Sequence, residues 1–282
     1  MPSEANLQTI SLDELPELCD LYRVDWPKYA YTFYTLENFY SWRDLLPTGE
    51  VQVFTDAKRD WRTTGTFVLK DCNELFFYTL ETTVDSLEQV LRMVMNSMSA
   101  SMSLVYDSCF RDMVDRSVSF LSFAKNSDER MMCYRQVEPH NEGKDRQNEL
   151  QPEYRFSAVK PEDSVIVEQQ WVHNDPIFTE LPTRLIKRNP SLGVYDTNDR
   201  LVAWCLIDQT GSLAIFQTVP EHRRKGLGLA LIERFCKQLH DKGQLPQAYV
   251  VDSNVASRSL FEKLGFTVVE MWYWTKVHKQ VS

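Results

Sequence analysis

Glycines and basic residues meet at one point of this 282-residue chain, in the stretch Arg223-Arg-Lys-Gly226-Leu-Gly228. A β-rich run over 212–219 leads into it, and an apolar i, i+3, i+4 stripe predicts a helix over 225–240. Glycine at a helix start lets a ligand approach the backbone closely, and the first N–H groups of a helix have no partners within it. With the helix dipole and the flanking cations, this pattern indicates a site for a phosphate-like anion.

Two other phosphate-binding patterns do not fit this stretch. A dinucleotide fold needs G-x-G-x-x-G early in a βαβ unit with an acid about 20 residues later, and a Walker loop needs G-K-[ST]. For the short motif alone, a tight strand-to-helix turn made soluble by basic residues remains the alternative. The residues that follow the motif therefore decide between these interpretations.

The pattern continues after a predicted strand, Gln247–Val251, with Asn254, Ser257 and then Leu260-Phe-Glu-Lys-Leu-Gly-Phe266. This combination resembles the GNAT superfamily, in which an R/Q-x-x-G-x-G/A loop and an N-x-x-A-x-x-L-Y-x-k-x-G-F helix build the acyl-CoA site. The resemblance implies that the amides of 224–229 bind the CoA pyrophosphate and that the main chain of 217–219 pairs with pantetheine. Asn254 is implied beside that arm, and it also fits a helix N-cap. The implied acyl-CoA contacts are Gln217, Thr218, Val219, Arg223, Arg224, Lys225, Gly226, Leu227, Gly228, Leu229, Asn254 and Phe261.

A narrower resemblance extends over most of the chain. Ala203-Trp-Cys-Leu-Ile-Asp-Gln-Thr-Gly211, Thr218-Val-Pro-Glu-His-Arg223 and Asp25-Trp-Pro-Lys-Tyr29 are similar to the glycine N-acyltransferase-like family. It implies an enzyme that moves an acyl group from acyl-CoA or acetyl-CoA directly to a small primary amine, such as glycine. Two alternatives stay open: a non-catalytic acyl-CoA-binding scaffold, and a protein N-acetyltransferase.

The catalytic groups depart from the superfamily pattern. Phe261 stands where many members have a tyrosine general acid, and Ser212 stands where glycine-conjugating relatives have a glutamate proposed as base. Asp208, His222 and Gln217 are the remaining candidates. For Asp208 a turn is a sufficient structural reason, a surface role is favoured for His222, and Gln217 is equally explained as an edge residue. No serine or cysteine lies in a nucleophile motif, so a covalent intermediate is not expected.

The polar, aperiodic segment 138–153 reads as a linker that divides the chain into halves. The second half, 154–282, predicts the order β-α-α-β-β-β-α-β-α-β. The first half, 1–137, predicts a similar order but lacks the glycine loop. We therefore expect an α/β (α+β, mixed-sheet) protein of tandem GNAT-like domains, with a degenerate N-terminal domain that does not bind CoA.

Composition limits the partners. Residues 1–150 carry 15 basic and 25 acidic side chains, a net −10, and the remainder carries 16 and 15, a net +1. This balance disfavours nucleic acid, and no apolar run is long enough to suggest a membrane span. Six scattered cysteines and five histidines without ligand spacing predict reduced thiols and no metal. We expect an intracellular monomer: the absence of a recognisable transit peptide favours the cytoplasm, and the family resemblance leaves the mitochondrion as the alternative.

Overall fold

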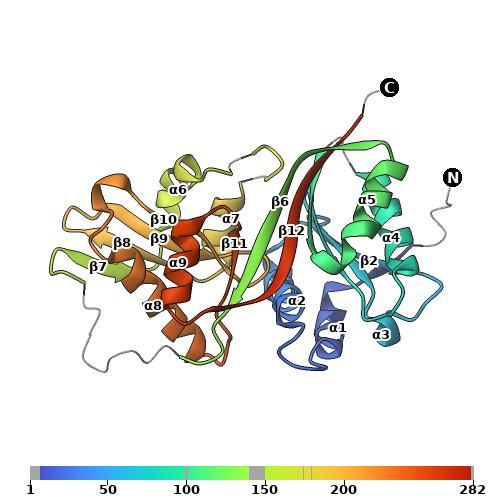
Figure 1. Cartoon of the computed structure of the whole chain (residues 1–282), viewed down its shortest axis with the longest axis horizontal. Helices are drawn as coiled ribbons and strands as arrows, with labels where there is room; N and C mark the ends of the chain where they lie inside the picture. Colours follow the sequence, from blue (N-terminus) through green and yellow to red (C-terminus); the bar gives the residue numbers. More distant parts are fainter. Residues whose placement is uncertain (1–6, 99–100, 140–149, 174, 179, 281–282) are drawn as a thin grey trace. The chain divides into compact units, whose positions relative to one another are not determined.

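The computed structural model describes residues 7–98, 101–139, 150–173, 175–178 and 180–280. The chain forms two compact units. The first unit comprises Met1–Met131, Asp175–Thr179 and Glu270–Ser282, and the second comprises Met132–Asn174 and Glu180–Val269. The elements of both are labelled in Figure 1.

The first unit contains a mixed sheet with the strand order β1-β2-β3-β4-β5-β12-β6, in which β12 comprises Thr267–Lys279. From β1 to β12, neighbouring strands are antiparallel except β4 and β5, which run parallel. Its strands are β1 (Leu7–Ile10), β2 (Val51–Asp56), β3 (Phe67–Asp71), β4 (Glu74–Tyr78), β5 (Ser101–Asp107) and most of β6 (Phe123–Arg135). Its helices are α1 (Leu15–Leu21), α2 (Ala30–Trp42), α3 (Trp61–Thr64), α4 (Asp85–Ser97) and α5 (Arg111–Phe120).

The end of the chain belongs to the first unit. From Glu270 on, strand β12 (Thr267–Lys279) pairs antiparallel with β5, in register from Trp272↔Asp107 to His278↔Ser101. The predicted division at 137 and 153 had placed this strand in the second domain. Strand pairing is set by backbone hydrogen bonds between segments far apart in sequence, which local periodicity does not report.

The second unit contains a mixed sheet with the order β11-β10-β9-β8-β7. Strands β10 and β11 are parallel, and the other pairs are antiparallel. Its strands are β7 (Tyr154–Ser157), β8 (Ser191–Asp196), β9 (Leu201–Ile207), β10 (Leu213–Thr218) and β11 (Gln247–Val251). Its helices are α6 (Ser164–Gln170), α7 (Leu181–Arg188), α8 (Leu227–His240) and α9 (Val255–Lys263). The predicted mixed-sheet α/β class is confirmed.

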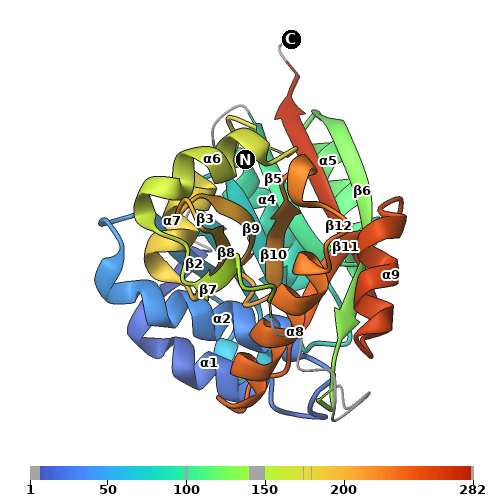
Figure 2. The same ribbon diagram turned by 90° about the vertical axis from the view of Figure 1, so that its left-hand side faces the viewer.

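Helices cover both faces of this second sheet (Figure 2). A buried cluster joins α8 and α9 to one face, where Leu231, Phe235 and Phe261 meet Cys205 and Val250. Helix α7 packs against β9, and Figure 2 places α6 and α7 on the side away from α8. The stripe that predicted α8 is therefore the stripe that faces the core.

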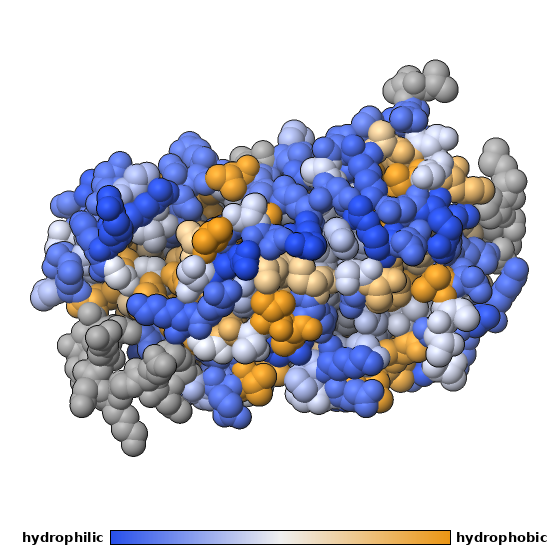
Figure 3. Space-filling view, viewed as in Figure 1, coloured by the Kyte–Doolittle hydropathy of each residue, from blue (hydrophilic) through white to orange (hydrophobic). Residues whose placement is uncertain are grey.

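On the face drawn in Figure 3, hydrophilic side chains dominate and apolar ones form small separate groups. In the second unit, Val255, Val268 and Val269 are among the exposed large apolar residues. Within the described ranges, no helix is both long and apolar enough to cross a membrane.

Candidate functional site

The connection from β10 to α8 ends at Gly226, which is the N-cap residue of α8 and adopts φ +79°. No side chain caps the helix there, and a Cβ at Gly226 would meet no atom within 4 Å. The preceding Arg224 also has a left-handed φ of +60°. The start of α8 is therefore open on the Cβ side of Gly226 and has no side-chain cap from the described residues, as an anion site requires.

The second glycine of the loop, Gly228, lies where helix α8 packs closely against strand β10. A Cβ at Gly228 would lie 2.8 Å from Cζ of Phe216 on β10, well inside contact distance. Glycine thus allows the first turn of α8 to lie directly against the strand. In this motif, Gly226 faces open space and Gly228 allows helix α8 to lie close to strand β10.

Beside this loop, strands β10 and β11 pair only at Leu213↔Ala248. In the first unit the corresponding strands β4 and β5 pair at three positions. Strand β10 also contains an irregularity between Ala214 and Gln217, where Ile215 has φ +48°. Beyond Leu213, the β11 side of β10 therefore has backbone groups that an extended ligand can pair with, like an added strand.

Three exposed cations follow β10. Arg223, Arg224 and Lys225 form no ion pair with any described residue. The Nε of Arg223 donates to the carbonyl of Thr218 at 3.0 Å. Within the described ranges, the loop thus presents three cations without an ion-pair partner next to the helix N-terminus.

Tyr154 contacts two residues of this loop, and sequence analysis did not single it out. Its hydroxyl lies 3.0 Å from Nζ of Lys225 and 2.9 Å from Nδ1 of His222. The Tyr154 and His222 rings meet edge to face, with centroids 5.6 Å apart. A tyrosine 71 residues before Lys225 has no local signal that could have revealed these contacts.

Comparison with known proteins agrees with this geometry. The model of the FR47-like protein family matches residues 191–275. Glycine N-acyltransferase from cattle (Bos taurus) is 25% identical over 118 residues, which are 41% of this chain and 40% of that protein's length. A Drosophila protein of solved structure aligns with a TM-score of 0.84 at 21% identity, covering 96% of this chain and 98% of that one. A tandem GNAT protein from the clavulanic acid biosynthesis pathway aligns with a TM-score of 0.59 at 10% identity, covering 98% and 99%. The chain therefore has the GNAT fold, and together these matches support a GNAT-type N-acyltransferase.

The GNAT helix after strand β11 begins as predicted. Asn254 is the N-cap of α9, and its Oδ1 accepts a hydrogen bond from the Ser257 amide at 3.1 Å. Phe261 is only 3% exposed, and its ring stacks on Tyr134 at 6.1 Å and packs edge-on against Phe266 at 5.0 Å. Phe261 is therefore a core residue of this GNAT unit, and its contact with CoA stays a prediction.

Asp208 and Ser212 build the turn between β9 and β10. Oδ1 of Asp208 accepts hydrogen bonds from the Thr210 amide (2.8 Å), the Thr210 hydroxyl (2.6 Å) and the Ser212 amide (3.1 Å). Burial raises the pKa of Asp208 to about 6, and these hydrogen bonds oppose the rise. The Ser212 side chain is fully buried and bonds to Thr210 at 2.9 Å. Both residues are accounted for by the turn.

Gln217 lies on β10 directly opposite Trp204 of β9. Its side chain is part-buried and hydrogen-bonds no other side chain or backbone group in the described part of the chain. Of the other predicted contacts, Thr218 and Val219 follow on the strand, Leu227 is buried in the core, and Leu229 is part-buried. Among the candidate catalytic residues, Gln217 alone has its polar group uncommitted.

The first unit has no equivalent loop. Helix α4 starts at Asp85 with Val84 at its N-cap, and no glycine occurs between β4 and α4. Glu81, in the same connection, pairs with Arg59 and accepts a hydrogen bond from Thr66 at 3.2 Å. A carboxylate near this helix start disfavours a phosphate.

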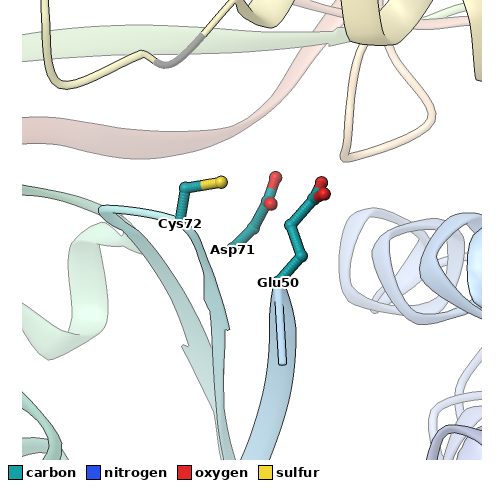
Figure 4. A group of neighbouring side chains, drawn as sticks. All are labelled: Glu50, Asp71 and Cys72. Carbon is teal, nitrogen blue, oxygen red and sulfur yellow. The ribbon is translucent and has the colours of Figure 1, made fainter. Parts of the chain in front are cut away.

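The first unit also contains a grouping of possible metal ligands, Glu50, Asp71 and Cys72 (Figure 4). Their ligand atoms lie within 4.8 Å of one another. The sheet register explains this, because Val51 pairs with Asp71 and the Cys72 amide donates to the Glu50 carbonyl at 3.2 Å. Among the residues that the structure describes, no further ligand joins this grouping.

Proposed function

We propose that the second unit binds acyl-CoA and transfers its acyl group directly to a small primary amine, such as glycine. The start of α8 at Gly226, beside three cations that pair with no carboxylate of the described residues, carries this proposal. A pyrophosphate matches it in charge and in hydrogen-bonding capacity. The first unit, without such a loop, serves packing or acceptor selection.

The pantetheine arm has a place next to this loop. Strand β10 continues for five residues beyond its single pairing with β11 at Leu213. Main-chain groups of 217–219 can then pair with the amides of pantetheine, and Asn254 lies at the start of the helix that follows β11. This arrangement brings the thioester beside Gln217.

In the proposed reaction, an amine nitrogen replaces the CoA sulfur on the thioester carbon. The amine nitrogen attacks the thioester carbon, the C–N bond forms, and the C–S bond breaks as CoA leaves. A backbone N–H of β10 can polarise the carbonyl. The proton lost by the amine ends on the CoA sulfur, so the reaction needs groups that can pass it on.

Tyr249 on β11 is suited to deliver that proton. Ala248 and Val250 belong to the core cluster beneath α8 and α9, so strand alternation places the part-buried Tyr249 on the other face. Ala203 and Cys205 belong to the same cluster, which puts Trp204 and its cross-strand partner Gln217 on the Tyr249 face as well. We assign Tyr249 the role of general acid that Phe261 cannot fill.

Two other functions compete with the proposed one. A scaffold would bind acyl-CoA and release no CoA thiol, whereas the proposed enzyme releases thiol when a small amine is present. A protein N-acetyltransferase would release thiol only when a peptide is the acceptor. Measuring thiol release across acyl donors, amino acids and peptides separates the three.

Replacing Gly226 with Asp tests the site. The side chain enters open space but brings a carboxylate to the helix N-terminus, and calorimetry should show loss of CoA binding. Gly243→Asp is the matched control, since Gly243 follows α8, has φ +73° and also faces open space. If folded Gly226→Asp binds CoA like Gly243→Asp, the proposed site is wrong.

A further inference from the structure

Tyr154 lies at the start of edge strand β7 and is 8% exposed, yet its hydroxyl contacts the loop that follows β10. The two contacts, to Lys225 Nζ (3.0 Å) and His222 Nδ1 (2.9 Å), flank the same oxygen. A phenol oxygen carries one proton and two lone pairs. This inventory fixes the direction of the Lys225 contact and leaves the phenol proton for the His222 contact.

Lysine can only donate, so the Lys225 contact uses a lone pair of the Tyr154 oxygen. The phenol proton then remains available for His222 Nδ1. If Tyr154 donates it there, His222 is the neutral tautomer that carries its proton on Nε2. Nε2–H lies on the far side of the imidazole ring from Tyr154, where it can donate to another group.

The side chains of Lys225 and His222 make no hydrogen bond to any described residue other than Tyr154. Lys225 keeps two further N–H donors, and among the described residues neither Lys225 nor His222 pairs with a carboxylate. A lysine side chain is flexible, and holding it in one place reduces the entropy lost when a ligand binds. Tyr154 thus fixes two donors within the basic loop without neutralising its charge.

We propose that Tyr154 is a positioning residue of the CoA site, whose hydroxyl directs the Lys225 ammonium and the His222 Nε2–H toward the phosphates of CoA. This rests on the proposed function. Tyr154 does not touch the reacting atoms, so it sets the affinity for CoA and leaves the acyl-transfer step alone.

Tyr154→Phe in the full-length protein separates the hydroxyl from the ring, because phenylalanine keeps the packing. Losing a hydrogen bond to a charged group should weaken CoA binding about tenfold by calorimetry. In turnover assays KM for acyl-CoA should rise while kcat stays unchanged. The control is Tyr195→Phe, which removes another buried hydroxyl of the second unit, bonded to Asp163 (2.7 Å) and to the Lys160 amide (3.0 Å). That variant should bind CoA like wild type.

A double-mutant cycle that combines Tyr154→Phe with Lys225→Met tests whether Tyr154 acts on CoA binding through Lys225. If Tyr154 acts by placing Lys225, the double variant should bind CoA little more weakly than Lys225→Met alone. Nitrogen NMR of His222 gives a second readout: the proton should reside on Nε2 in wild type, and this preference should be lost in Tyr154→Phe.

Three results would overturn the proposal: unchanged CoA affinity in Tyr154→Phe, additive effects in the cycle, or an Nδ1-protonated His222 in wild type. Failure of the proposed function looks different, because Gly226→Asp and Lys225→Met would then bind CoA as wild type does. That outcome would remove the role of Tyr154 together with the site.

Discussion

Gly228 and Phe216 are in direct competition for space at the start of α8. The built Cβ position at Gly228 lies 2.8 Å from the Phe216 ring, and this glycine has no positive φ. Gly226 differs, with a positive φ and open surroundings. In the proposed CoA site, Gly226 gives the ligand access to the start of α8, and Gly228 allows the contact of helix and strand that positions the amides of α8.

Gly228→Ala should therefore weaken both stability and CoA binding. Overpacking of this kind costs about 1–3 kcal/mol in the free energy of unfolding. Phe216→Leu in the same protein makes room and should restore much of both quantities. Urea unfolding and calorimetry on the single and double variants measure this. If Phe216→Leu gives no relief, the contact is not the reason for the glycine.

Tyr249→Phe tests the assignment of the acid. Losing a positioned acid lowers kcat by about 10²–10⁴-fold, while the KM for acyl-CoA should hold because the ring remains. Steady-state thiol release with one working amine acceptor gives both constants. Phe261→Tyr is the companion variant, and it should lose stability without gaining rate, because its hydroxyl enters a core position. Full activity in Tyr249→Phe would refute the role.

At the scale of elements, the local sequence pattern predicted the bounds of several helices and strands well. The helix over 225–240 and the strands at 191–196, 201–207 and 247–251 match α8, β8, β9 and β11 within two residues. The glycine loop was found because its signal is local. Tyr154 was not, because its contacts join residues about 70 positions apart. Phe261 was predicted at the CoA site from its motif position, but whether its ring faces core or ligand is decided by tertiary packing.

In the first unit, Asp128 joins β6 to α5 and β12. Arg111 donates to Oδ1 of Asp128 at 2.6 Å, and the Thr275 hydroxyl donates to it at 2.7 Å. Burial alone would raise the pKa of Asp128, but the hydrogen bonds from Arg111 and Thr275 outweigh it and lower the pKa to about 2. The carboxylate form is thus favoured by folding.

Asp128→Asn should consequently destabilise the protein in a pH-dependent way. The folded-state pKa lies below the ordinary value of 3.8, so this contribution is complete above that pH and is lost as the pH falls toward 2. Urea unfolding at pH 7, 4 and 2.5 should show the gap between wild type and variant closing. The control, Asp199→Asn, removes a surface partner of Arg155 and Lys160 and should cost less. A gap that is independent of pH would contradict the account.

At the scale of the whole molecule, the last strand of the chain follows the second unit in sequence but belongs mostly to the first unit. Seven consecutive residues of β12 pair with β5. The Trp272 ring stacks on Tyr78 at 6.5 Å, and the Trp274 Nε1 donates to the Ser103 hydroxyl at 2.7 Å. The first unit therefore uses a strand that follows the second unit in sequence, so neither half of the sequence contains a complete unit.

A fragment of residues 1–137 should accordingly fail to fold by itself. It leaves β5 without its β12 partner and exposes the surface that Trp272 covers, while a free strand edge favours aggregation. Near-UV circular dichroism should show no fixed aromatic packing, and urea should give no cooperative transition. A synthetic peptide of residues 270–280, added in excess, should restore both, because binding to the folded form shifts the equilibrium. The same peptide with Trp272→Ala and Thr275→Ala is the control, since it loses the stacking and the hydrogen bond to Tyr106. If the fragment alone unfolds cooperatively and the peptide changes nothing, the domain boundary predicted near residue 137 is right and β12 is dispensable to the first unit.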